Sequence, residues 1–167
     1  LKYLKNNDWI PDNYFQQDEW RNIADESWCI RLLLKTNTKP ELTNNLVQKK
    51  INETYSFINK NYSKETKVAA VIHTILMLND AKGFDKDMEF FQNYVAELAS
   101  DKELLRDVHL QANILEALAK SNYNDKEKLR DIANFLIEKQ DKNGAWYMSE
   151  KKENFLQVFT TFRAILA

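Results

Sequence analysis

Apolar residues recur along this chain at helical spacing, and two kinds of segment alternate. Segments of the first kind carry a single apolar stripe and lie at 42–58, 91–98 and 129–137. Segments of the second kind are apolar on nearly every side and lie at 28–34, 68–78 and 105–120. A single stripe is typical of a half-exposed helix, whereas apolar residues all round indicate a buried one. The pattern therefore predicts outer helices that alternate with inner helices.

Polar turns separate these segments, at 36–40, 59–63, 79–85, 100–103 and 121–125. Acidic and hydroxyl residues just before an apolar segment are the usual N-caps of helices. We therefore expect an inner helix to begin near Asp25, and another to be capped by Ser100 or Asp101. We also expect Asp125 to cap the helix that contains the last single stripe.

Similar positions recur with a period near 40 residues. The pairs Phe57-Ile58, Tyr94-Val95 and Phe135-Leu136 are separated by 37 residues (94 − 57) and 41 residues (135 − 94). A period of this length is typical of stacked helical hairpins. We expect one all-α domain over 1–167, an α/α toroid, partial or complete. The alternative is a HEAT-like α-solenoid, which would leave the concave face of its inner helices exposed to solvent.

Composition agrees with a helical domain and excludes several classes of function. The 167 residues are 44% hydrophobic and include only 2 Gly and 2 Pro, which favours long helices. A formal charge of −1 without a basic stripe argues against nucleic-acid binding. No apolar run is long enough to span a membrane, and a single cysteine fits a reducing compartment, so we expect a cytoplasmic location.

Because the chain starts at Leu1 and ends in an apolar segment, we expect a fragment of a longer protein with flanking domains.

One motif is more specific than the periodicity. Phe135 and Leu136 are followed by Gln140, Gly144 and Trp146, giving the pattern aromatic-Leu-x3-Gln-x3-Gly-x-Trp. This pattern resembles the QW repeat of squalene and oxidosqualene cyclases, and the flanking residues 107–166 are similar to the helices around a late repeat in that family. The resemblance implies an α/α toroid of the terpenoid cyclase superfamily. It also implies structural roles for Gln140 and Trp146, with Trp146 largely buried.

The resemblance also implies where a catalytic acid should lie. Class II terpene cyclases protonate an alkene with an Asp at the start of an inner helix, one repeat before the repeat matched here. An alkene is a poor base, so that acid must be strong and kept in a dry cavity. The corresponding segment 63–66 contains no Asp, only Glu65 between Lys64 and Lys67. Asp25 is the remaining candidate acid, although we favour a role for it as a helix cap.

No cofactor or metal site is expected. Cys29, His73 and His109 are the soft ligands of the chain, and none has a partner at ligand spacing, so structural roles are favoured. Asp85 and Asp87 are expected to cap the helix that contains Met88 rather than to bind magnesium.

The function favoured by these observations is that of a diverged terpenoid-cyclase-like domain. We expect it to lack protonation-type cyclase activity of its own and to bind a hydrophobic, isoprenoid-like ligand or a protein segment. The alternative is an active squalene- or diterpene-type cyclase domain that flanking sequence completes.

Overall fold

The computed structural model describes residues 18–37, 40–101 and 104–147, so the helix expected over 154–167 lies outside the described residues. Within the described residues the chain forms six α-helices and one short 3-10 helix, with no strand. The all-α prediction is therefore confirmed. The helices are α1 (Asp18–Thr36), α2 (Pro40–Ile58), α3 (Lys64–Asp80), α4 (Asp85–Leu98), the 3-10 helix η3 (Leu104–Arg106), α5 (Val108–Lys120) and α6 (Lys126–Lys139).

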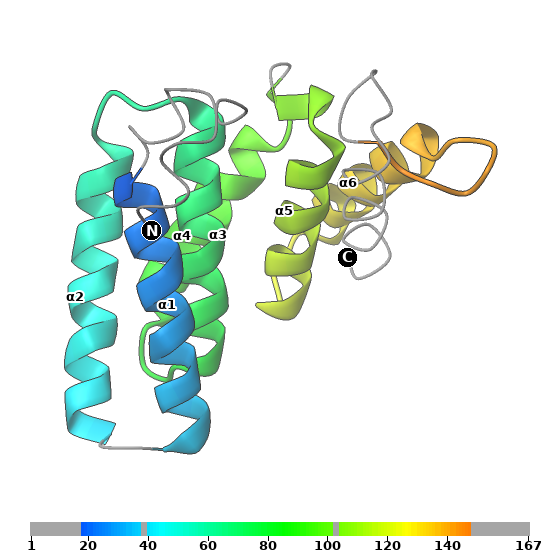
Figure 1. The fold of residues 1–167 in the computed structure, drawn as a ribbon. Helices are drawn as coiled ribbons and strands as arrows, with labels where there is room; N and C mark the ends of the chain where they lie inside the picture. The colour runs from blue at the N-terminus through cyan, green and yellow to red at the C-terminus, as the bar shows by residue number, and fades with distance from the viewer. Residues whose placement is uncertain (1–17, 38–39, 102–103, 148–167) are drawn as a thin grey trace.

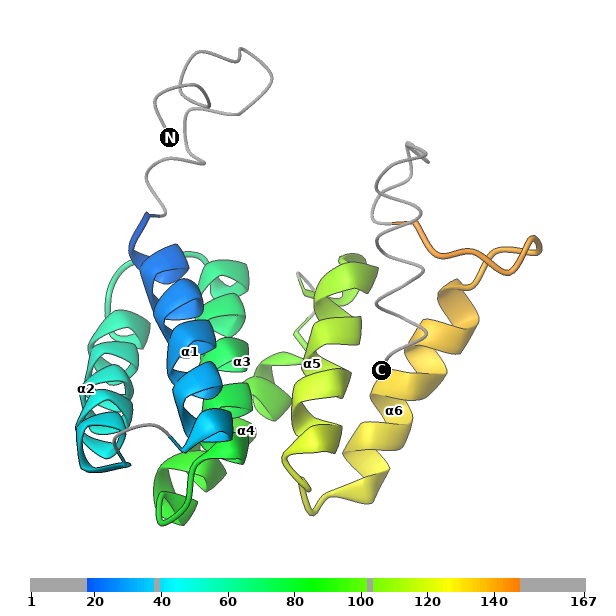
Figure 2. The ribbon, with the colours of Figure 1, turned by 60° about the horizontal axis from the view of Figure 1, so that its bottom comes forward.

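The helices are arranged in two layers. In the first layer α1 packs against α3, and α3 packs against α5. Each of these three helices also packs against the helix that follows it in the chain, which is α2, α4 or α6. Both ribbon views show α2 beyond α1 at one end and α6 beyond α5 at the other (Figure 1, Figure 2). As a result, α3 lies at the centre of the array.

Helix α3 contributes the largest share of the core. The predicted burial of 68–78 is confirmed, because Val71 and Ile75 are fully buried and so are most of the residues around them. The helix is also tied to α2 by a hydrogen bond of 2.9 Å between the hydroxyls of Thr54 and Thr74, both fully buried. Each of these hydroxyls has a second partner in its own helix, so neither polar group is buried at a large cost.

Helix α1 differs from the expectation in its start and in its burial. It begins at Asp18, so Asp25 lies seven residues (25 − 18) into the helix and is not its cap. The earlier start follows from Trp20 and Ile23, which pack against Phe57 of α2 and Ala70 of α3. The prediction that 28–34 is buried all round is also wrong, because the side chains of Trp28 and Leu32 are each 53% exposed.

The caps of the later helices were predicted with mixed success. Asp125 caps α6 as expected, and its carboxylate accepts a hydrogen bond of 2.9 Å from the amide of Lys128. The cap expected at Ser100 or Asp101 is wrong, because α5 begins at Val108 and is capped by Asp107. The apolar run continues across this boundary, since Leu104 in the preceding 3-10 helix is fully buried. An unbroken apolar pattern therefore did not mean an unbroken helix.

Candidate functional site

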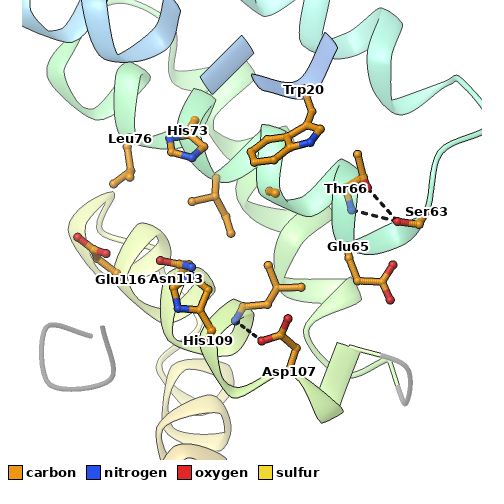
Figure 3. Close-up of a pocket in the computed structure, with 13 residues that line it drawn as sticks. Trp20, Ser63, Glu65, Thr66, His73, Leu76, Asp107, His109, Asn113 and Glu116 are labelled. Carbon is orange, nitrogen blue, oxygen red and sulfur yellow. Dashed lines mark hydrogen bonds between the residues drawn. The ribbon is translucent and has the colours of Figure 1, made fainter. Parts of the chain in front are cut away.

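A cleft of about 480 Å³ lies between α3 and α5, with Trp20 of α1 on a third side. Trp20 and His73 face the space from one side, and His109 and Asn113 face it from the other (Figure 3). From α3 and the turn before it the lining residues are Ser63, Glu65, Thr66, Ala69, Ile72, His73 and Leu76. From α5 and its cap they are Asp107, His109, Leu110, Asn113 and Glu116.

The sequence places these side chains on facing surfaces through helical spacing. On α3 the lining positions 65, 69, 72, 73 and 76 are separated by three or four residues or lie next to one another, which gives one face of the helix. On α5 the positions 109, 113 and 116 follow the same rule. Because α3 and α5 pack side by side, their two faces border one cleft.

Both helices begin at the same end of this cleft, and both beginnings are capped. The hydroxyl of Ser63 accepts a hydrogen bond of 3.3 Å from the amide of Thr66. The carboxylate of Asp107 accepts one of 2.9 Å from the amide of Leu110. The predicted helix start at 63–66 is therefore confirmed, and the segment that would hold the acid in a cyclase borders the cleft.

The lining combines an apolar surface with hydrogen-bonding groups. The apolar part consists of Trp20, Ala69, Ile72, Leu76 and Leu110. The polar part includes Asn113, both histidines of the chain and three carboxylates. Among the carboxylates, Glu116 is buried at 7% exposure and accepts a hydrogen bond of 2.5 Å from the ammonium of Lys120. A concave, largely apolar surface with a few polar groups is the usual form of a small-molecule site.

Asp25, the candidate catalytic acid, does not line this cleft. Its side chain is exposed to solvent in the middle of α1, so it neither caps the helix nor lies in a dry cavity. The sequence predicts a helix start near Asp25 because the apolar run begins at Trp28. That prediction is wrong, because the packed surface of α1 starts two turns before Trp28, at Trp20 and Ile23.

The QW-like residues lie at the end of α6, separate from the lining of the cleft. Phe135 and Leu136 are on α6, and the carbonyl of Leu136 accepts a hydrogen bond of 2.6 Å from the indole N–H of Trp146. The side-chain amide of Gln140 donates a hydrogen bond of 3.0 Å to the carbonyl of Gly144, and Gly144 has a positive φ of +80°. Trp146 is partly buried. These hydrogen bonds hold the turn against the end of α6, so the contacts seen for Gln140 and Trp146 stabilise local structure.

The potential metal ligands are brought together only in part. His73 and His109 line the same cleft, whereas Cys29 is exposed on α1. Within 18–37, 40–101 and 104–147 no group of three or more His, Cys, Asp or Glu residues has the arrangement of a metal site. The sequence did contain a signal that the two histidines share a surface. They are 36 residues apart (109 − 73), close to the repeat period, and both lie on helices predicted to be inner.

The prediction that the acidic pair caps α4 is wrong, because the N-cap residue is Phe84 and no side-chain hydrogen bond caps this helix. Asp85 and Asp87 lie in the first turn, where a negative charge interacts favourably with the helix dipole. Asp87 also accepts a hydrogen bond of 3.1 Å from the hydroxyl of Tyr55. Burial, with a smaller contribution from this bond, raises the pKa of Tyr55 to about 12.

Comparison of the chain with family models, with curated proteins and with solved structures finds no match. Among the described helices, none is both long enough and apolar enough to cross a membrane. The site itself is therefore the basis for inferring a function.

Proposed function

We propose that this chain is a diverged terpenoid-cyclase-like domain, part of an α/α toroid, that binds a hydrophobic ligand in the cleft between α3 and α5. The observation that carries the proposal is the cleft itself, in which Ile72, Leu76 and Leu110 present apolar surface to a space of about 480 Å³. Spaces of about 300–1,000 Å³ are typical of small-molecule sites. In this proposal α1, α3 and α5 belong to the inner ring of the toroid. The QW-like turn, residues 140–146, stabilises the end of the outer helix α6.

The acids of the cleft support binding rather than alkene protonation. The segment 63–66 provides Glu65, whose side chain is exposed, where the resemblance calls for an Asp in a dry site. Asp107 accepts a backbone hydrogen bond as the cap of α5. Glu116 is buried beside the space that Trp20 borders, and this is the feature that favours the alternative of a cyclase completed by flanking sequence. Its hydrogen bond to Lys120 gives it a structural role that does not require a reaction.

A neutral apolar fluorophore, N-phenyl-1-naphthylamine, tests whether the cleft binds apolar molecules. We expect Ala69→Trp to weaken its binding at least about tenfold, because the indole fills the space beside Ile72. Ala119→Trp is the matched control, since Ala119 is exposed on α5 and does not line the cleft. Fluorescence titration measures both affinities, and circular dichroism verifies that each variant is folded. Unchanged binding by a folded Ala69→Trp variant would contradict the proposal.

A further inference from the structure

The lining of the cleft is strongly unbalanced in charge. It contains the three carboxylates of Glu65, Asp107 and Glu116, and among the described residues that border it there is no lysine or arginine. The lining therefore carries a formal charge of −3 with neutral histidines, whereas the whole chain carries −1. Negative charge is concentrated at this one apolar surface.

Nearby lysines cancel only part of this charge, that of Glu116. Lys64 forms an ion pair with Asp101 at 2.5 Å, and Lys120 forms one with Glu116 at 2.5 Å from a half-exposed position. Within the described part of the chain, no ion pair involves the carboxylate of Glu65 or of Asp107. Among the described side chains, none with a positive charge therefore forms an ion pair with two of the three carboxylates that border the cleft.

The two helix N-termini at this end of the cleft reduce the negative charge but do not reverse it. A helix N-terminus is equivalent to about half a positive charge, so α3 and α5 together supply about +1 against the −2 of Glu65 and Asp107. The first-turn amides of Thr66 and Leu110 already donate to Ser63 and Asp107. Helix N-termini usually attract anions. Here the carboxylates of Glu65 and Asp107 lie at the two N-termini and would repel an anionic ligand.

We propose that the ligand of this cleft is an amphiphile with a cationic head group, such as an alkylamine or a quaternary alkylammonium. The inference rests on the proposed function and adds the charge of the ligand to it. The alkyl chain lies along Ile72, Leu76 and Leu110, and the head group lies near Glu65 and Asp107. The indole of Trp20 adds a surface suited to a cation, and it already has the guanidinium of Arg21 at 5.9 Å from its ring centre.

Three ligands that share a ten-carbon chain test the head group, namely decyltrimethylammonium, 1-decanol and decanoate. Isothermal titration calorimetry below their micelle-forming concentrations gives the three affinities. We expect the cation to bind at least about tenfold more tightly than the alcohol, and decanoate to bind most weakly. Raising the salt concentration should weaken only the binding of the cation.

Variants that remove the negative charges test whether Glu65 and Asp107 cause the preference for the cation. Glu65→Gln with Asp107→Asn should reduce the affinity for the cation to that for the alcohol and leave the alcohol unchanged, because Asn preserves the cap of α5. The matched control is Glu89→Gln with Glu97→Gln, two exposed positions on α4 outside the cleft, which should change nothing. Equal binding of cation and alcohol, or tightest binding of decanoate, would overturn the inference and leave the proposed function standing. Failure of all three ligands to bind would overturn both.

Discussion

Helices α1 and α3 have similar apolar segments but very different burial. In α3, Val71 and Ile75 are fully buried, and even His73 on its cleft side is partly covered. In α1, Trp28 and Leu32 lie one turn apart and more than half of each side chain is exposed. The guanidinium of Arg31 lies 5.5 Å from the ring centre of Trp28, so this surface retains some local contacts.

The difference comes from the number of neighbours that each helix has. Helix α3 packs against α1, α2, α4 and α5, whereas α1 packs chiefly against α2 and α3 among the described helices. The apolar residues of a helix thus set the largest surface that it can bury. Its position among the other helices determines how much of that surface is in fact buried. An apolar face at one end of an array is therefore not equivalent to a core face.

The largest expected effect is a difference in stability between these two helices. Ile75→Ala removes a fully buried side chain of α3, so we expect the free energy of unfolding to fall by about 2–5 kcal/mol. Leu32→Ala on α1 should cost no more than about 0.5 kcal/mol, because that side chain is already half exposed. Urea unfolding followed by circular dichroism measures both. Similar losses in the two variants would show that α1 is more buried in solution than the structure indicates.

A second pair compares tryptophans near opposite ends of the array. Trp146 is partly buried and donates a hydrogen bond to the carbonyl of Leu136, so Trp146→Ala should cost about 2–3 kcal/mol. Trp28→Ala should cost only about 1 kcal/mol, mainly through the loss of the contact with Arg31. The melting temperatures of the two variants provide the test. A larger shift for Trp28→Ala would exclude the structural role assigned to the QW-like turn.

The smallest expected effect concerns how α1 is held to α2 in acid. Glu26 of α1 accepts a hydrogen bond of 2.5 Å from Lys50 of α2, which lowers the pKa of Glu26 below its ordinary value of 4.5, against the opposing effect of burial. Because the folded-state pKa is below the unfolded value, this contribution is fully present above about pH 4.5 and is lost as the pH falls through the folded-state pKa. The effect is small, since the side chain of Glu26 is 56% exposed.

Melting temperatures at pH 6 and pH 3 measure this contribution. The native protein should lose slightly more stability over that interval than Glu26→Gln, which cannot lose a charge at this position. Glu89→Gln provides a control at an exposed carboxylate of α4 that lies outside the first turn of its helix. Identical losses in the native protein and in Glu26→Gln would mean that the bond to Lys50 does not contribute.

Local sequence signals predicted the fold best where a single residue determined the local geometry. Asp125 caps α6 as predicted, and Ser63 as the cap of α3 and Gly144 at a positive φ occupy positions typical of their residue types. The start of α1 was missed because the packing of Ile23 on α2 and α3 depends on residues distant in sequence. The start of α5 was missed because Leu104 is buried in a 3-10 helix, which apolar periodicity does not distinguish from an α-helix.

The cleft was less predictable than the fold. Its lining joins α1, α3 and α5, and each contributes side chains with an ordinary interpretation in isolation. His73 and His109 were assigned structural roles because neither has a ligand at close spacing in sequence. Only the packing of α3 against α5 brings them to one surface, and only there does the excess of carboxylates become visible. A site formed by helices that are distant in sequence has no short sequence signature.

The two-layer arrangement also restricts how such a chain can change in length. A helix of the first layer, such as α3, needs apolar residues on several faces, whereas one of the second layer, such as α6, needs a single stripe. Insertion or deletion of one helix would move every later helix into the layer for which its residues are unsuited. Gain or loss of two helices leaves each later helix in its own layer. Evolution of this architecture by duplication should therefore proceed in even steps, with helical hairpins as the inherited unit.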